Sequence, residues 1–275
     1  MIAQFYKEYR WLFLVLFAEL NVYFISGLTI SNLQGNHFFK FWPDVFFQVP
    51  YAAGIPQFLA QNKWAGILTD ALVWSLPLVL CTFSKNPWPA RIGLVINYLF
   101  YVTIQGYHTH GNFTIGYALF YFPFIFYKNT NRFYALEVLR YFLLFYYFSS
   151  AWIKISYGHI THINEFSQML AGQFAPYFVE NNLGWRTSLN LYLINHPPLS
   201  YIIYLSGVFI ELLAVIGFFT KKFDRKLAIL LLILHFGNYV VMDIAPYGHL
   251  AFVCLLFYSC RWQVLHKDFG KKRAC

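Results

Sequence analysis

Long apolar runs alternate with short polar segments along most of this chain. Eight runs stand out by their near-continuous hydrophobic residues: 11–30, 65–83, 92–108, 113–127, 134–153, 200–219, 227–245 and 247–262. A helix needs about 20 apolar residues to cross a hydrocarbon layer of about 30 Å. A transmembrane β-barrel would instead alternate polar and apolar residues within each strand, and these runs do not alternate. The pattern therefore predicts an all-α, polytopic integral membrane helical bundle with about eight transmembrane helices.

The composition supports this fold class. Of the 275 residues, 59% are hydrophobic, 23% are aromatic and only 11% are charged. An ordinary soluble domain has about 45–50% apolar and about 25% charged residues, so too few charges remain here to solvate a surface. We expect one transmembrane domain over residues 1–262, followed by a basic cytoplasmic tail over residues 263–275.

The distribution of positive charge predicts the orientation. With a cytoplasmic N-terminus, the inner segments hold 15 of the 20 Lys and Arg residues, as the positive-inside rule requires. Both termini are then cytoplasmic, and segments 31–64 and 155–199 lie outside. The net charge of +9 follows from this topology, so no nucleic-acid partner is expected. We expect a multi-pass protein of a bacterial inner membrane whose main partner is the lipid bilayer.

The two outer segments are too long to be simple turns. Apolar residues in 155–199 recur at a spacing of three and four, which predicts an amphipathic helix lying in the outer interface. The other outer segment is rich in aromatic residues over 38–51. Such an apolar surface is typical of a contact with another membrane protein.

Polar residues within the apolar runs are the strongest functional signal, because each is costly to insert into a membrane. Glu211 and His235 flank the inner turn 220–226 at equal distance along the chain, which places them at equal depth. Asn238 lies one helical turn beyond His235 and shares its face. We therefore expect Glu211 and His235 to meet near the bilayer midplane. Two interpretations stay open, a structural clamp and a proton-handling or substrate site.

Lys154 ends a run of aromatic residues at the outer side. A lysine at this position can extend its amine to the interface, as lysines near helix ends commonly do. Shielded from water among aromatic side chains, it would instead become a neutral amine that acts as a base. The sequence leaves both roles open.

Histidines on the outer side suggest a metal site only weakly. His108-Thr-His110 and His159-x-x-His162 could each supply two ligands. Neither pattern matches the repeated histidine-rich boxes of membrane di-iron enzymes. We therefore predict no metal.

Three short stretches, in order, resemble the horizontally transferred transmembrane (HTTM) domain family, which is related to vitamin K-dependent gamma-glutamyl carboxylase. They are His110-Gly-Asn-Phe-Thr-Ile-Gly-Tyr-Ala-Leu, Ser150-Ala-Trp-Ile-Lys154 and Leu234-His235-Phe-Gly-Asn238-Tyr. The first is similar to a histidine segment that opens a transmembrane helix, the second to a segment that ends in the catalytic lysine, and the third to a His-x-x-Asn helix.

The resemblance implies a site near the outer membrane face. Lys154 would be the base that deprotonates a reduced, vitamin K-like quinone, and His110 would support the carbanion formed on a substrate. His235 and Asn238 would line the interior, together with Glu211, and we include His108 in the same substrate-binding set.

Two classes of function follow. The first is a quinol-linked enzyme, a carboxylase-like lyase or oxidase that acts on a substrate such as a peptide at the outer face. The alternative is a non-catalytic membrane subunit or assembly factor that binds a partner membrane protein. A transporter is disfavoured, because neither paired repeats nor discontinuous helices are evident.

The predicted topology can be tested by cysteine labelling. In a background without native cysteines, Lys222→Cys should resist a membrane-impermeant maleimide in intact cells, whereas Tyr157→Cys should react, because positions 222 and 157 fall on opposite sides of the membrane. Labelling of position 222 from outside would reverse the orientation.

Overall fold

The computed structural model describes residues 2–33, 45–83, 86–107, 116–179, 184–242, 250–257 and 259. Within these ranges all regular structure is helical and no strand occurs, which confirms the all-α class. The elements in chain order are α1 (Ile2–Ile25), η1 (Ile30–Asn32), α2 (Val45–Ala52), α3 (Ile55–Gln61), α4 (Lys63–Phe83), α5 (Trp88–Tyr107), α6 (Gly116–Tyr121), η2 (Phe122–Ile125), α7 (Asn129–Ser156), η3 (His159–Thr161), α8 (Glu165–Val179), α9 (Trp185–Asn195), α10 (Pro197–Phe219) and α11 (Asp224–Met242).

The chain forms two compact units. The first unit comprises residues 1–139 and 247–275, and the second comprises residues 140–246. The division falls within α7, between Leu139 and Arg140.

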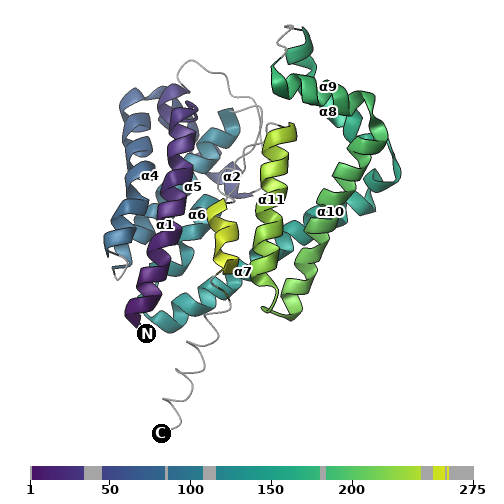
Figure 1. Cartoon of the computed structure of the whole chain (residues 1–275). Helices are drawn as coiled ribbons and strands as arrows, with labels where there is room; N and C mark the ends of the chain where they lie inside the picture. Colours follow the sequence, from purple (N-terminus) through teal and green to yellow (C-terminus); the bar gives the residue numbers. More distant parts are fainter. Residues whose placement is uncertain are drawn as a thin grey trace. The chain divides into compact units, whose positions relative to one another are not determined.

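In the first unit, α1 packs against α4, and α4 packs against α5 (Figure 1). The ring of Phe13 lies in the core against Phe120 and Phe124, at centroid distances of 5.3 Å and 4.8 Å. Two buried carboxylates in this unit bind backbone amides. Asp70 accepts hydrogen bonds from two amides of η1, and Glu19 accepts bonds from the amides of residues 250 and 251. These carboxylates bind amide groups that lack partners within their own helices, which accounts for acidic residues in apolar runs.

In the second unit, α10 and α11 form an antiparallel hairpin, and α8 packs against both α9 and α10 (Figure 1). Six buried residues from α7, α8, α9 and α10 form its apolar core: Ala151, Phe166, Leu170, Leu193, Tyr204 and Val208. The helix α8 lies in the segment predicted to be amphipathic. Its residues Phe166, Leu170 and Phe174 recur at a spacing of four and are buried, whereas Met169 and Tyr177 are exposed.

Four segments within the described residues are long and apolar enough to cross a membrane: Arg10–Asn32, Lys63–Thr82, Pro197–Phe219 and Asp224–Met242. The predicted count of about eight spans is not confirmed. Within the described part of the run 113–127, residues 116–125 form the six-residue helix α6 and the four-residue turn η2. At about 1.5–2 Å per residue these ten residues are too short to cross the layer. The proline in this run, Pro123, lies in η2.

Helix α5 covers residues 92–107 of the predicted span 92–108, and α7 covers the predicted span 134–153. Their 20 and 28 residues give sufficient length, but neither is among the four segments that combine length with high hydropathy. In the aromatic segment 38–51, residues 38–44 lie outside the described residues. Phe47 of this segment is buried and stacks on Tyr51, so this side chain belongs to a core and is not part of an exposed apolar surface.

A close approach of α7 and α10 gives the first structural prediction. A Cβ atom on Gly217 would lie 2.6 Å and 2.8 Å from the two methyl carbons of Leu144, which is itself fully buried. Gly217→Ala should therefore destabilise the protein by about 1–3 kcal/mol, measured by thermal unfolding in detergent.

Gly237 on α11 is the matched control, because a Cβ atom there meets nothing within 4 Å. Gly237→Ala should leave stability unchanged or raise it by up to about 1 kcal/mol, since alanine favours helix over glycine. Equal stability of the two variants would contradict the packing of α7 on α10.

Candidate functional site

One face of α7 carries three polar side chains at regular spacing. Arg140, Tyr147 and Lys154 are separated by seven residues each, close to two helical turns, so they lie along one face. Leu144 and Ala151, on the same face, are fully buried. We call Arg140, Tyr147 and Lys154 the α7 polar stripe. Each of its members binds a residue of the α10–α11 hairpin.

Lys154 binds Glu211 of α10. Its Nζ atom lies 2.7 Å from both carboxylate oxygens, and the hydroxyl of Ser150 donates a third hydrogen bond to Oε1 at 3.2 Å. The Glu211 side chain is only 9% exposed, whereas that of Lys154 is 31% exposed. The carboxylate is thus held inside the unit, while the amine is reachable from its surface.

Tyr147 binds His235 of α11. The phenol oxygen lies 2.5 Å from Nε2 of the imidazole, and the two rings meet edge to face with centroids 5.8 Å apart. Both residues are buried. A phenol donates to Nε2 when the imidazole is neutral with its proton on Nδ1, so the contact favours this tautomer.

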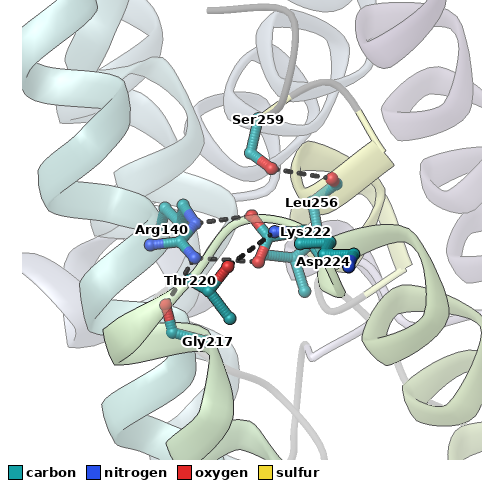
Figure 2. Close-up of polar contacts among 7 residues, drawn as sticks. All are labelled: Arg140, Gly217, Thr220, Lys222, Asp224, Leu256 and Ser259. Carbon is teal, nitrogen blue, oxygen red and sulfur yellow. Dashed lines mark hydrogen bonds and ion pairs between the residues drawn. The ribbon is translucent and has the colours of Figure 1, made fainter. Parts of the chain in front are cut away.

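Arg140 binds the turn between α10 and α11. Its Nε and Nη2 atoms lie 2.6 Å and 2.8 Å from the two carboxylate oxygens of Asp224, the first residue of α11. Nη2 also donates to the carbonyl oxygen of Gly217, in the last turn of α10 (Figure 2). The last carbonyl groups of a helix have no hydrogen-bond partner within that helix, and Arg140 provides one for Gly217. Arg140 therefore binds both the end of α10 and the start of α11. Both charged side chains of this pair are almost completely buried.

The sequence identified some of these residues and missed others. It predicted that Glu211 and His235 meet, whereas the structure gives each of them a partner on a third helix, α7. Asn238 is half-buried on α11, one turn from His235. His108 and His110 lie outside the described residues. The seven-residue spacing along α7 was the available signal for Tyr147, but the role of Asp224 required the fold of the hairpin.

One of the outer histidines that were weighed as metal ligands, His159, contacts a carboxylate. Nδ1 of His159 lies 2.7 Å from a carboxylate oxygen of Glu165, at the start of α8. Across the described part of the chain, no group of three His, Cys, Asp or Glu side chains is arranged to hold a metal ion.

Comparison with known proteins adds no relative. The chain matches no protein-family model, no curated protein and no solved structure.

The buried Arg140–Asp224 pair gives a stability prediction. Asp224→Ala leaves the guanidinium buried with the Gly217 carbonyl but without its counter-ion, and losing one partner of a buried ion pair costs about 3–5 kcal/mol. The midpoint of thermal unfolding in detergent should fall by several degrees.

Replacing both charges is the control. Arg140→Met combined with Asp224→Leu leaves no uncompensated charge, so this variant should be more stable than Asp224→Ala. If Asp224→Ala unfolds at the wild-type temperature, the pair does not form as described.

Proposed function

We propose that the chain is a multi-pass membrane protein in which Lys154 and Glu211 together accept a proton from a lipid-soluble quinol. Four segments have the length and hydropathy of membrane spans. On α10 and α11 large apolar side chains face outward, among them Phe209 and Phe236, which are 61% and 68% exposed. Glu211 and His235, on the same helices, are buried. This inverted distribution suits a protein surrounded by lipid.

One observation carries the proposal: Nζ of Lys154 binds both carboxylate oxygens of Glu211, and the Lys154 side chain is partly exposed. Two carboxylate oxygens around one Nζ atom hold the resting pair as ammonium and carboxylate. The pair has no net charge, so it can take up one proton and become ammonium and carboxylic acid. Nζ would pass its own proton to Glu211 and accept the incoming proton in its place. Ser150 would keep the carboxylate oriented during this exchange.

The surroundings suit an aromatic, lipid-soluble substrate. Trp152 and Phe145 on α7 are 57% and 58% exposed, so the helix that carries the amine also presents aromatic surface to lipid. A quinol bound there would supply the hydroxyl proton and the electrons that reduce oxygen. The resemblance of residues 150–154 and 234–239 to the HTTM family supports the same chemistry. We extend the proposal to a site near the outer face of a bacterial inner membrane, with both termini in the cytoplasm.

A second candidate function is a non-catalytic subunit that binds a partner membrane protein. The hydrogen bonds of Glu211 favour this function, because Lys154 and Ser150 already bind its carboxylate. The other two members of the α7 polar stripe bind the same hairpin. In this case the polar contacts would serve the fold alone.

Oxygen uptake distinguishes the two functions. The full chain is reconstituted in liposomes with reduced naphthoquinone or ubiquinone analogues, and wild type is compared with Lys154→Arg. A guanidinium keeps the ion pair with Glu211 but does not release its proton, so the rate should fall about 10²–10⁴-fold. Glu211→Gln should be similarly inactive, because no acceptor for the proton remains.

Lys128→Arg is the matched control, because Lys128 is exposed on the other unit and should retain full activity. If Lys154→Arg retains the wild-type rate, Lys154 is not the proton acceptor. If the wild-type protein is folded but consumes no oxygen with any analogue, the proposed quinol function is wrong. The non-catalytic subunit is then the remaining candidate function.

A further inference from the structure

The turn that joins α10 to α11 concentrates positive charge. Residues 220–226 read Thr-Lys-Lys-Phe-Asp-Arg-Lys, with four basic residues and one acidic residue. Lys222, Arg225 and Lys226 are exposed, whereas Asp224 is completely buried.

The only acidic residue of this segment does not offset the exposed charge. Both carboxylate oxygens of Asp224 bind Arg140, at 2.6 Å and 2.8 Å (Figure 2). The negative charge of Asp224 is thus balanced inside the unit. The outer surface of the turn therefore has a strongly positive potential.

Two of the lysines lie near one aromatic ring. The Nζ atoms of Lys222 and Lys226 each lie 5.8 Å from the ring centroid of Phe223, and this phenyl group is 36% exposed. The two ammonium groups and the ring make one exposed cluster. An anion bound by either ammonium group would have the phenyl ring of Phe223 close by.

The cluster is built on an ordered turn. The amide of Lys222 donates to Oγ1 of Thr220 at 3.1 Å, and the amide of Asp224 donates to the carbonyl of Lys221 at 3.1 Å (Figure 2 shows the first of these bonds). Arg140 holds the same turn from inside. A ligand would therefore meet a pre-formed arrangement, which reduces the entropy lost on binding.

The position of the turn identifies the kind of ligand. It connects two of the four segments that suit a membrane span, Pro197–Phe219 and Asp224–Met242. A turn between two spans lies at the level of the lipid headgroups, where basic residues meet anionic phosphates and exposed aromatic side chains meet the acyl boundary.

We propose that Lys222, Phe223 and Lys226 form a binding site for the phosphate of an anionic phospholipid. The two ammonium groups bind the phosphate oxygens, and Phe223 contacts the upper part of the lipid chains. This inference rests on the membrane location proposed above, but not on any chemistry at Lys154. The protein can therefore bind the lipid and consume no oxygen, or consume oxygen and not bind the lipid, so the two proposals are tested separately.

Native mass spectrometry of the full chain in a neutral detergent provides the test, with phosphatidylglycerol and phosphatidylcholine as probes. Wild type should bind phosphatidylglycerol in preference to phosphatidylcholine. Loss of one charge near the headgroups weakens binding about fivefold, so Lys222→Gln with Lys226→Gln should weaken phosphatidylglycerol binding by up to about 25-fold. Lys222→Arg with Lys226→Arg keeps both charges and should retain binding.

Lys63→Gln with Lys128→Gln removes the same charge from exposed positions elsewhere and is the matched control, expected to bind within about twofold of wild type. Equal losses in both double variants would show a general charge effect and overturn the site. Inorganic phosphate that competes fully with the lipid would also overturn it, because the ligand would then be free phosphate. A second measurement on wild type needs no variant: phosphatidylglycerol binding should weaken as salt rises from about 0.05 to 0.5 M, and salt-independent binding would contradict the proposal.

Discussion

A charged or strongly polar side chain inside an apolar helix pair requires a partner, and in the second unit these partners come from one face of α7. Glu211, His235 and Asp224 lie on the α10–α11 hairpin, and each binds a different member of the α7 polar stripe. Placing an ionised group in a membrane span costs about 2.5–3.5 kcal/mol on insertion scales, so an unpaired carboxylate or guanidinium would be unstable there. The contacts restrict how α7 can rotate and slide against the hairpin. The close packing of Leu144 on Gly217 adds a steric restriction between the same elements.

The three contacts differ in what else they allow. The Arg140–Asp224 pair is sealed from the surface, and its bonds reach both ends of the hairpin turn, so it suits a structural role. The Tyr147–His235 contact joins two buried side chains. The Lys154–Glu211 pair alone combines a buried carboxylate with a partly exposed amine. This asymmetry is the reason for assigning the proton-accepting role to Lys154 and Glu211. The same pair is also compatible with a non-catalytic subunit, in which the ion pair serves only to stabilise the fold.

The sequence was sufficient to predict the two helices of the hairpin, α10 and α11. It was insufficient to predict that α7 supplies the partners of their buried polar residues. The apolar runs 200–219 and 227–245 correspond closely to α10 and α11, because length and hydropathy determine such helices locally. Counting from the turn correctly marked Glu211 and His235 as buried polar residues. Counting gives depth along a helix but not the identity of a third helix that packs beside both residues. The polar contacts with Tyr147 and Ser150 therefore required the tertiary structure.

Two other elements show where hydropathy alone misleads. The run 113–127 is apolar, yet its described part consists of a short helix and a 3₁₀ turn that contains Pro123. Asp224 lies among four basic residues and reads as part of a solvated turn, although its side chain is completely buried against Arg140. For Asp224, the burial depends on a distant partner, Arg140, which the local pattern does not show.

Charge reversal at the Lys154–Glu211 pair tests most directly whether α7 and the hairpin are joined by these polar contacts. Lys154→Glu and Glu211→Lys would each place two like charges side by side, whereas the two changes together restore an ion pair in the opposite direction. Thermal unfolding of the full chain in detergent should show a lower midpoint for each single variant and a substantial recovery in the double variant. A double variant no more stable than the weaker single variant would mean that the two side chains do not contact each other, and it would contradict the account.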